Sequence, residues 1–352
     1  MNLKSFKLWL NVVTIVALVV LVYVSREQII EAFKQMADLN YFWLFLMIPL
    51  QLCNYGAIAK YYQTYLKNLG EEIRFKELYK VALEMNFVNN VFPSGGVSGF
   101  GYFGIRMKSI GVPASKATLT QVMRHTLTFM SFIVYMIIAL VFLTFVGDTT
   151  RFIVLASSMI IGVILVATTL IVYIISSAQR VKKFTAFLPR GINYISKKIF
   201  RGKLPHINIE KIETLFGQLH DDYQMIHSNW ASLKKPFLYT LLMNLTELLT
   251  IAVVYYAFGT TVNFGALIIA YAVANIAGLV AILPGGVGIY EGLMTAVLAS
   301  SGIPKALALS KTVVYRVLNM AMFLPVGYFF YQKALRKTSS DSDKPVSAID
   351  ES

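Results

Sequence analysis

The stretch that decides the fold reads NIAGLVAILPGGVG at residues 275–288, where a proline and two glycines interrupt a long apolar run. A related stretch, NFVNNVFPSGGVSG, occupies residues 86–99, about 190 residues earlier. Proline removes a backbone donor, and glycine adopts conformations that are closed to other residues. Each stretch therefore predicts a break in a helix, with backbone groups freed to face a ligand.

Further landmarks follow both breaks in the same order. The first break is followed by GVP at 111–113 and by Arg124, and the second by GIP at 302–304 and by Arg316. The asparagines that open the two stretches, Asn86 and Asn275, are 189 residues apart, and the two arginines are 192 residues apart. The spacing between the copies therefore changes by only three residues. Small insertions between related halves would leave this drift, so the four ordered landmarks indicate an internal repeat.

The composition is typical of a membrane protein. Hydrophobic residues make up 57% and charged residues 14% of the 352 residues, against about 25% charge in soluble domains. A helix needs roughly 20 apolar residues to cross the hydrocarbon core. Seven runs meet or approach that length: 8–24, 41–59, 127–146, 152–175, 237–258, 266–283 and 306–331. We therefore predict an all-α polytopic membrane protein with about seven or eight spans, plus broken or re-entrant helices.

The basic residues predict the orientation of the spans. Most of the 32 Lys and Arg residues lie at the N-terminus and at 60–80, 106–116, 180–235 and 333–344. This asymmetry is the positive-inside signature, so we expect a multi-pass protein of the plasma membrane with both termini in the cytoplasm. The orientation of the spans accounts for most of the net charge of +14. The basic residues would also attract anionic lipid headgroups. We expect no nucleic-acid partner.

The expected organisation is an integral membrane bundle over residues 1–337 and a disordered cytoplasmic tail over 338–352. The bundle is expected to contain halves at about 41–175 and 236–331, joined by a basic cytoplasmic loop at 176–235. The run 8–24 has no small-residue cleavage site after it, so we interpret it as a retained span.

Metal chemistry finds little support in the sequence. Cys53 is the single cysteine, which excludes a disulfide within the chain and a cysteine-rich metal site. The His and Asp residues within 220–227 match no zinc-ligand spacing. The sequence indicates neither catalytic residues, nor metal ligands, nor a cofactor.

The direction of the spans relates the two breaks. Counting from the cytoplasmic side places them on helices that run in opposite directions, so we expect an inverted repeat. In transporters with inverted repeats the binding site lies where broken helices meet near the bilayer midplane. The alternative is a purely structural role as tight re-entrant turns. The Gly-x-x-x-Gly spacing at 95–99 and at 288–292 favours close packing in either case.

Ionisable side chains at membrane depth are the candidates for such a site, because they are costly to bury there. Glu247 lies near the middle of the run 237–258, and Glu291 follows the second break. Arg124 and Arg316 are suited to gripping a phosphate, or alternatively each neutralises a glutamate. The predicted lipid-binding and translocation site comprises Asn86, Asn90, Pro93, Gly95, Gly96, Arg106, Arg124, Glu247, Asn275, Pro284, Gly285, Gly286, Glu291 and Arg316.

The two broken stretches resemble the transmembrane region of lysylphosphatidylglycerol synthases, also called the flippase-like family. The resemblance extends over roughly residues 8–331, and the string LPGGVGIYEG at 283–292 is its most specific part. In the multiple peptide resistance factor, this region is implicated in moving lysylated phosphatidylglycerol to the outer leaflet. The family often carries an arginine soon after the first proline, whereas here Ser94, Gly95 and Gly96 follow it and Arg106 is the nearest basic residue.

The resemblance implies translocation of an anionic or lysylated phospholipid such as lysylphosphatidylglycerol, and with it resistance to cationic antimicrobial peptides. ATP is not the expected energy source, because the sequence holds no P-loop. Two alternatives stay open: a phosphatidylglycerol lysyltransferase or its membrane partner, and a membrane subunit for glycolipid synthesis. Only about 20 residues follow the last apolar run, so we do not expect an enzyme by itself. The expected partners are membrane phospholipids and a separate lipid-modifying enzyme.

Overall fold

The computed structural model describes residues 40–92, 97–146, 151–183, 229–278 and 286–342, together with isolated residues within 16–34 and 217–224. These residues form helices, turns and loops, with no strand among them. The main helices are α3 (Tyr41–Asn68), α4 (Phe75–Val91), α5 (Val97–Lys108), α6 (Ala114–Val146), α7 (Arg151–Ile175), α10 (Lys234–Ala257), α11 (Phe264–Gly278), α12 (Ile289–Ser300) and α13 (Lys305–Ser342). A short 3₁₀ turn, η2 (Trp230–Leu233), leads into α10.

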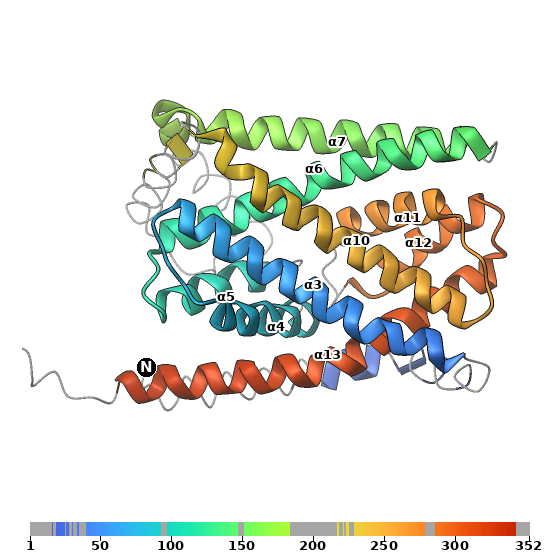
Figure 1. The fold of residues 1–352 in the computed structure, drawn as a ribbon, viewed down its shortest axis with the longest axis horizontal. Helices are drawn as coiled ribbons and strands as arrows, with labels where there is room; N and C mark the ends of the chain where they lie inside the picture. The colour runs from blue at the N-terminus through green and yellow to red at the C-terminus, as the bar shows by residue number, and fades with distance from the viewer. Residues whose placement is uncertain are drawn as a thin grey trace, which may run out of the picture.

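Four of these helices, α3, α6, α10 and α13, are long and apolar enough to cross a membrane. The prediction of an all-α polytopic membrane protein is therefore confirmed. Helix α7 has 25 residues and lies along α6 on the outside of the bundle (Figure 1). The predicted N-terminal span at 8–24 lies mostly outside the described residues.

Two helix pairs are too short to span. Helices α4 and α5 have 17 and 12 residues, and α11 and α12 have 15 and 12. At a rise of about 1.5 Å per residue they are roughly 18–26 Å long, less than the hydrocarbon thickness of about 30 Å. Figure 1 shows the α4–α5 pair in the left half of the bundle and the α11–α12 pair in the right half. The two helices of each pair enter and leave at the same end of the bundle (Figure 1), so we call each pair a re-entrant hairpin. Helix α11 covers the described part of the apolar run 266–283.

The order of elements repeats with opposite direction. A long helix, a short hairpin and a second long helix occur as α3–α4–α5–α6 and again as α10–α11–α12–α13. Figure 1 shows α3 running from right to left and α10 from left to right, and these two helices lie side by side in extensive contact. The hairpin helix α4 packs on α13, and its counterpart α11 packs on α6. The structure therefore has the inverted arrangement expected from the two breaks.

Glycine turns mark equivalent points in the two runs. Gly70 and Gly259 follow α3 and α10, and Gly111 and Gly302 follow α5 and α12, all with positive φ between 63° and 96°. At each point the amide after the glycine donates to a carbonyl five residues earlier in the chain, as in a Schellman motif. The sequence landmarks at 111–113 and 302–304 are therefore the same helix stop in both runs.

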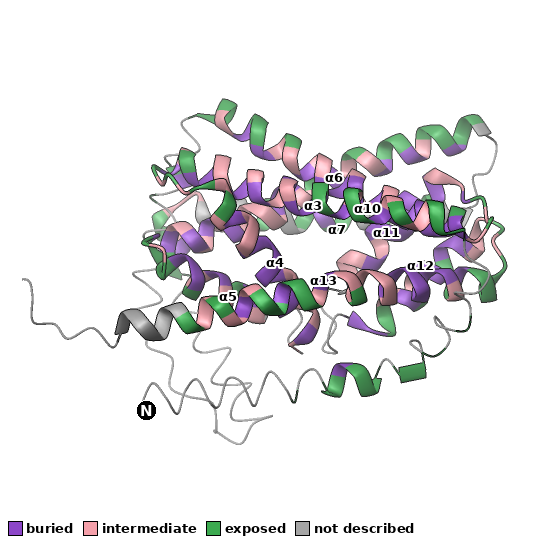
Figure 2. Cartoon of the chain, turned by 60° about the horizontal axis from the view of Figure 1, so that its bottom comes forward, coloured by how far each residue is buried: buried purple, intermediate pink, exposed green. Residues whose placement is uncertain are grey.

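The surface of the bundle is apolar where it faces outward. Large hydrophobic side chains of α6 and α7 are exposed, among them Phe142, Phe145, Leu155, Met159 and Val166. Figure 2 shows exposed residues along the outer helices, whereas most residues of α10 between Met243 and Ala257 are buried. An exposed apolar surface of this extent is expected in contact with lipid and not with water.

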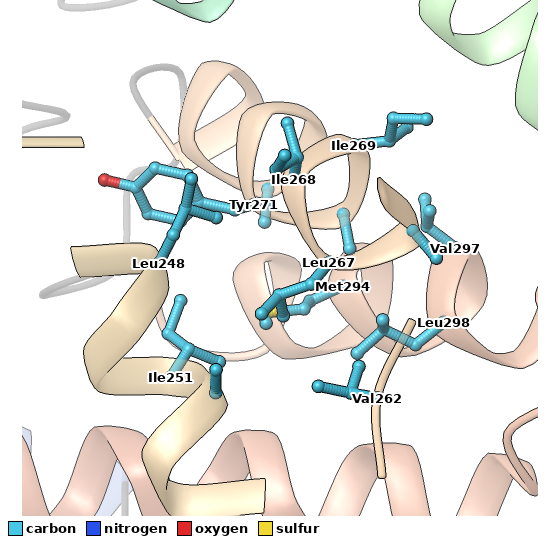
Figure 3. Close-up of a cluster of buried hydrophobic side chains, with 14 of the residues drawn as sticks. Leu248, Ile251, Val262, Leu267, Ile268, Ile269, Tyr271, Met294, Val297 and Leu298 are labelled. Atoms are coloured by element: carbon cyan, nitrogen blue, oxygen red, sulfur yellow. The ribbon is translucent and has the colours of Figure 1, made fainter. Parts of the chain in front are cut away.

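The largest apolar core holds the second hairpin against α10. Figure 3 shows Leu248 and Ile251 of α10 facing Leu267 of α11 and Met294 of α12. All four side chains are fully buried. Inside a bilayer such side chains gain little over contact with lipid, so this cluster holds the hairpin in place through close van der Waals packing.

Candidate functional site

A cavity of about 380 Å³ lies at the meeting point of the two hairpins and the four long helices. Residues from α3, α4, α5 and α6 and from α10, α11, α12 and α13 contribute to its wall. Its lining includes seven of the predicted site residues: Asn86, Asn90, Arg124, Glu247, Asn275, Gly286 and Arg316. Side chains that lie far apart in the sequence therefore converge on one polar cavity inside an apolar bundle.

Arg124 of α6 is held in this cavity by neutral groups. Its Nε donates to Oε1 of Gln121 at 2.9 Å, and its Nη2 lies 3.5 Å from Nε2 of His125. The Gln121 amide in turn donates to the Tyr62 hydroxyl at 3.3 Å. Within the described ranges, no carboxylate forms an ion pair with Arg124. Its guanidinium is thus oriented, and its charge has no counter-ion in the part of the chain that the structure describes.

Arg316 of α13 has a different environment. It forms an ion pair with Glu291 of α12, and both side chains are at least nine-tenths buried. The second carboxylate oxygen of Glu291 accepts a hydrogen bond from the Gly288 amide at 2.7 Å, which caps α12. The Arg316 guanidinium also lies over the Tyr290 ring, 4.9 Å from its centroid. Glu291 therefore joins the start of α12 to α13 beside the cavity.

Glu247 lies on the cavity wall midway along α10. It accepts hydrogen bonds from the Tyr315 hydroxyl of α13 and from the Gln51 amide of α3, the latter at 2.9 Å. Gln51 also donates to Thr250, and Asn54 one turn later donates to Thr246 and to the Met243 carbonyl. Polar contacts thus join α3 and α10 in the middle of their contact.

Asparagines line the ends of both hairpins near the breaks. In α4, the Asn90 amide donates to the side chain and the carbonyl of Asn86, both at 2.9 Å. In α11, the Asn275 amide donates to the Tyr271 carbonyl at 2.8 Å. On α13, Oδ1 of Asn319 is buried at the cavity and accepts no hydrogen bond from any described group. These amides place both donors and acceptors around the cavity.

The remaining predicted residues lie elsewhere. Arg106 is not on the cavity wall: its Nε donates to Glu84 at 2.9 Å inside the α4–α5 hairpin, and Glu77 lies 3.5 Å away. Pro93, Gly95, Gly96, Pro284 and Gly285 lie outside the described residues. Gly286 and Gly288, which follow the second break, both have positive φ, so the backbone there needs glycine.

Some lining residues were not predicted. Gln51, Asn54 and Gln121 supply polar groups, and Tyr271 and Tyr315 supply hydroxyls. The Tyr271 hydroxyl donates to Asn244 at 3.3 Å, and Figure 3 shows it pointing away from the labelled apolar cluster. The only sequence signal for these residues is an amide within an otherwise apolar run, at helical spacing in the case of Gln51 and Asn54.

An all-helical bundle with two opposed re-entrant hairpins around a polar cavity is the architecture of a polytopic membrane protein. A family model described as the lysylphosphatidylglycerol synthase TM region matches residues 8–327, and the chain belongs to this family. The resemblance seen in the sequence is therefore confirmed.

Membrane proteins designated UPF0104 are among its relatives. One from Methanothermobacter thermautotrophicus is 34% identical over 134 residues, which cover 36% of this chain and 40% of that protein. A second from Pyrococcus horikoshii is 22% identical over 322 residues, 90% of this chain and 93% of the relative. Another from M. thermautotrophicus is 21% identical over 327 residues, 90% of this chain and 92% of the relative.

Proposed function

We propose that the protein translocates phospholipids across the bilayer by admitting their phosphate-bearing headgroups to the central cavity. The observation that carries this proposal is Arg124, an oriented guanidinium on the cavity wall with no carboxylate partner among the described residues. A guanidinium presents a planar donor fork that matches a phosphate, and such charge-assisted hydrogen bonds are about twice as strong as neutral ones.

The surroundings of Arg124 suit a headgroup. The volume of about 380 Å³ falls within the range of roughly 300–1,000 Å³ found for small-molecule pockets. Amides of Asn86, Asn90 and Asn275 offer hydrogen bonds to glycerol or amine groups, and Glu247 offers an acceptor to an ammonium group. Anionic phospholipids and lysylated phosphatidylglycerol therefore both have complementary groups here, while the apolar outer surface accommodates acyl chains.

The orientation is part of the proposal. Helix ends that carry the basic segments, after α3, after α5 and before α10, gather at the left end of the bundle in Figure 1. We place this end on the cytoplasmic side of the plasma membrane, because short basic connections stay on that side. Helix α13 also ends there, so the C-terminus is placed in the cytoplasm. A separate lipid-modifying enzyme is a suitable cytoplasmic partner that would supply the lipid.

A liposome assay tests the function. Purified protein is reconstituted with fluorescent phosphatidylglycerol or lysylphosphatidylglycerol in the inner leaflet, and a membrane-impermeant quencher reports the lipid that reaches the outside. We expect faster exposure than in protein-free liposomes. Arg124→Gln is expected to lower the rate about tenfold or more, because one charge-assisted contact contributes about 1.5–3 kcal/mol.

The control is Arg74→Gln, since Arg74 is exposed at the start of α4 and makes no side-chain cap there. This variant is expected to match the unmodified protein. Exposure no faster than in empty liposomes, for both lipids, would rule the function out. Equal rates for Arg124→Gln and Arg74→Gln would show that translocation does not depend on Arg124.

A further inference from the structure

Glu247 differs from the other deeply placed carboxylates. Glu84 and Glu291 are 1% and 2% exposed, and each forms an ion pair with an arginine. Glu247 forms none within the described part of the chain, and its partners are the neutral donors of Tyr315 and Gln51. It is the fourteenth of the 24 residues of α10, so it lies near the middle of a spanning helix. An unpaired carboxylate at that depth costs at least about 2.5–3.5 kcal/mol, which neutralisation by a proton removes.

The groups around Glu247 favour a proton over a metal cation. Hard cations such as Na⁺ or Mg²⁺ need several oxygen ligands, whereas the Gln51 amide and the Tyr315 hydroxyl direct hydrogens at the carboxylate. The titratable and charged groups that line the cavity with it come from five helices: Tyr55 of α3, Arg124 and His125 of α6, Tyr271 of α11, Tyr290 of α12, and Tyr315 and Arg316 of α13. None of these groups is a second carboxylate that would complete a metal site.

Protonation would change both the charge and the contacts of the cavity. Adding one proton raises the net charge of the lining by one, which strengthens the binding of an anionic headgroup at Arg124. It also turns one carboxylate oxygen into a donor, so the hydrogen bond with the Tyr315 hydroxyl reverses its direction while Gln51 still donates to the other oxygen. The contact of α10 with α13 is thereby rearranged beside the cavity.

We propose that Glu247 binds a proton together with the headgroup, so that the protein couples lipid translocation to proton movement in the same direction. This inference rests on the proposed function. A proton from water forms an O–H bond with a carboxylate oxygen of Glu247 as the phosphate meets Arg124. The same proton returns to water when the headgroup leaves on the other side. By linkage, each ligand strengthens the binding of the other by the same factor.

Proton uptake on lipid binding tests the coupling directly. Short-chain phosphatidylglycerol is added to the purified protein in weakly buffered detergent solution, and a pH-indicating dye measures the protons taken up. We expect close to one proton per bound lipid. Glu247→Gln keeps the side-chain shape and an acceptor oxygen, and it is expected to bind the lipid with no proton uptake. Glu72→Gln, which removes an exposed carboxylate paired with Lys67, is expected to behave as the unmodified protein.

A flipping measurement separates this inference from the proposed function. With the liposome interior alkaline and the exterior acidic, inward movement of fluorescent phosphatidylglycerol is expected to accelerate several-fold in the unmodified protein and not in Glu247→Gln. If the unmodified protein and Glu247→Gln show equal acceleration, or equal proton uptake, the proposed coupling is wrong. The proposed translocation is not affected by that result. Failure of the unmodified protein to bind phosphatidylglycerol overturns the coupling as well. Uptake that depends on Glu247 without any flipping supports the proton site and rules out translocation.

Discussion

At the scale of single residues, the two arginines at matching positions of the repeat are held in different ways. Arg316 is paired with Glu291, which also caps α12, whereas Arg124 is positioned by the neutral side chain of Gln121. The sequence left open whether such arginines bind a phosphate or neutralise a glutamate. The contacts indicate that Arg316 neutralises a glutamate, and they leave the charge of Arg124 available in the cavity.

This difference predicts opposite stability effects for two similar substitutions. Arg316→Gln leaves the buried Glu291 carboxylate without its cation, so we expect a loss of about 3–5 kcal/mol in the free energy of unfolding. Arg124→Gln breaks no ion pair among the described residues, and we expect a change below about 1 kcal/mol. Equilibrium unfolding of the detergent-solubilised variants measures both values.

The double variant Glu291→Gln with Arg316→Gln provides the control. It removes both buried charges together, so it is expected to recover much of the stability lost by Arg316→Gln alone. A stability of Arg124→Gln as low as that of Arg316→Gln would contradict the different roles assigned to the two arginines.

At the scale of helices and hairpins, close approach of backbones fixes the positions of α4 and α11. A Cβ added to Gly327 of α13 would lie 2.6 Å from the Leu83 carbonyl oxygen of α4. A Cβ added to Gly265 of α11 would lie 3.1 Å from the Ala139 carbonyl oxygen of α6. The two contacts belong to equivalent helix pairs of the two runs. Small residues therefore seat each re-entrant hairpin against a long helix of the other run.

Gly327→Ala is expected to move α13 away from α4, because the obstacle is a backbone oxygen that cannot rotate aside. We expect a destabilisation of about 1–3 kcal/mol, typical of overpacking, measured by thermal unfolding in detergent. Gly162→Ala in α7 is the matched control, since nothing lies within 4 Å of its added Cβ. That variant is expected to be neutral or slightly stabilised through helix propensity. Equal stability of the two variants would show that the α4–α13 contact is loose.

The helical class, the breaks and their inverted relation were predictable, because each depends on local composition or on Pro and Gly. Glu247 was identifiable as a charge inside an apolar run, and Arg124 and the asparagines were identifiable from their places in the repeated stretches. Gln51 and Tyr315 were not, because they reach Glu247 from helices far away in sequence. The pairing of Arg106 with Glu84 also depends on how the hairpin closes.

At the scale of the whole molecule, the inverted arrangement makes the two hairpins open toward opposite ends of the bundle. The α4–α5 hairpin opens toward the end that carries the basic connections, and the α11–α12 hairpin opens toward the other end (Figure 1). The cavity lies between the inner ends of the two hairpins, so one hairpin leads from it toward each end of the bundle. This geometry is suited to moving a headgroup between two aqueous sides.

The arrangement predicts that the loops before the two hairpins face opposite sides of the membrane. Glu72 lies exposed between α3 and α4, and Thr261 lies exposed between α10 and α11. In a Cys53→Ala background, which removes the exposed native thiol, Glu72→Cys and Thr261→Cys place a single reactive thiol at each loop. A membrane-impermeant maleimide applied to intact cells is expected to label position 261 alone. Applied to inside-out vesicles, it is expected to label position 72 alone, because the proposed orientation places the basic end in the cytoplasm. Labelling of both positions from one side would contradict the inverted arrangement, and a reversed pattern would retain it while placing the basic end outside.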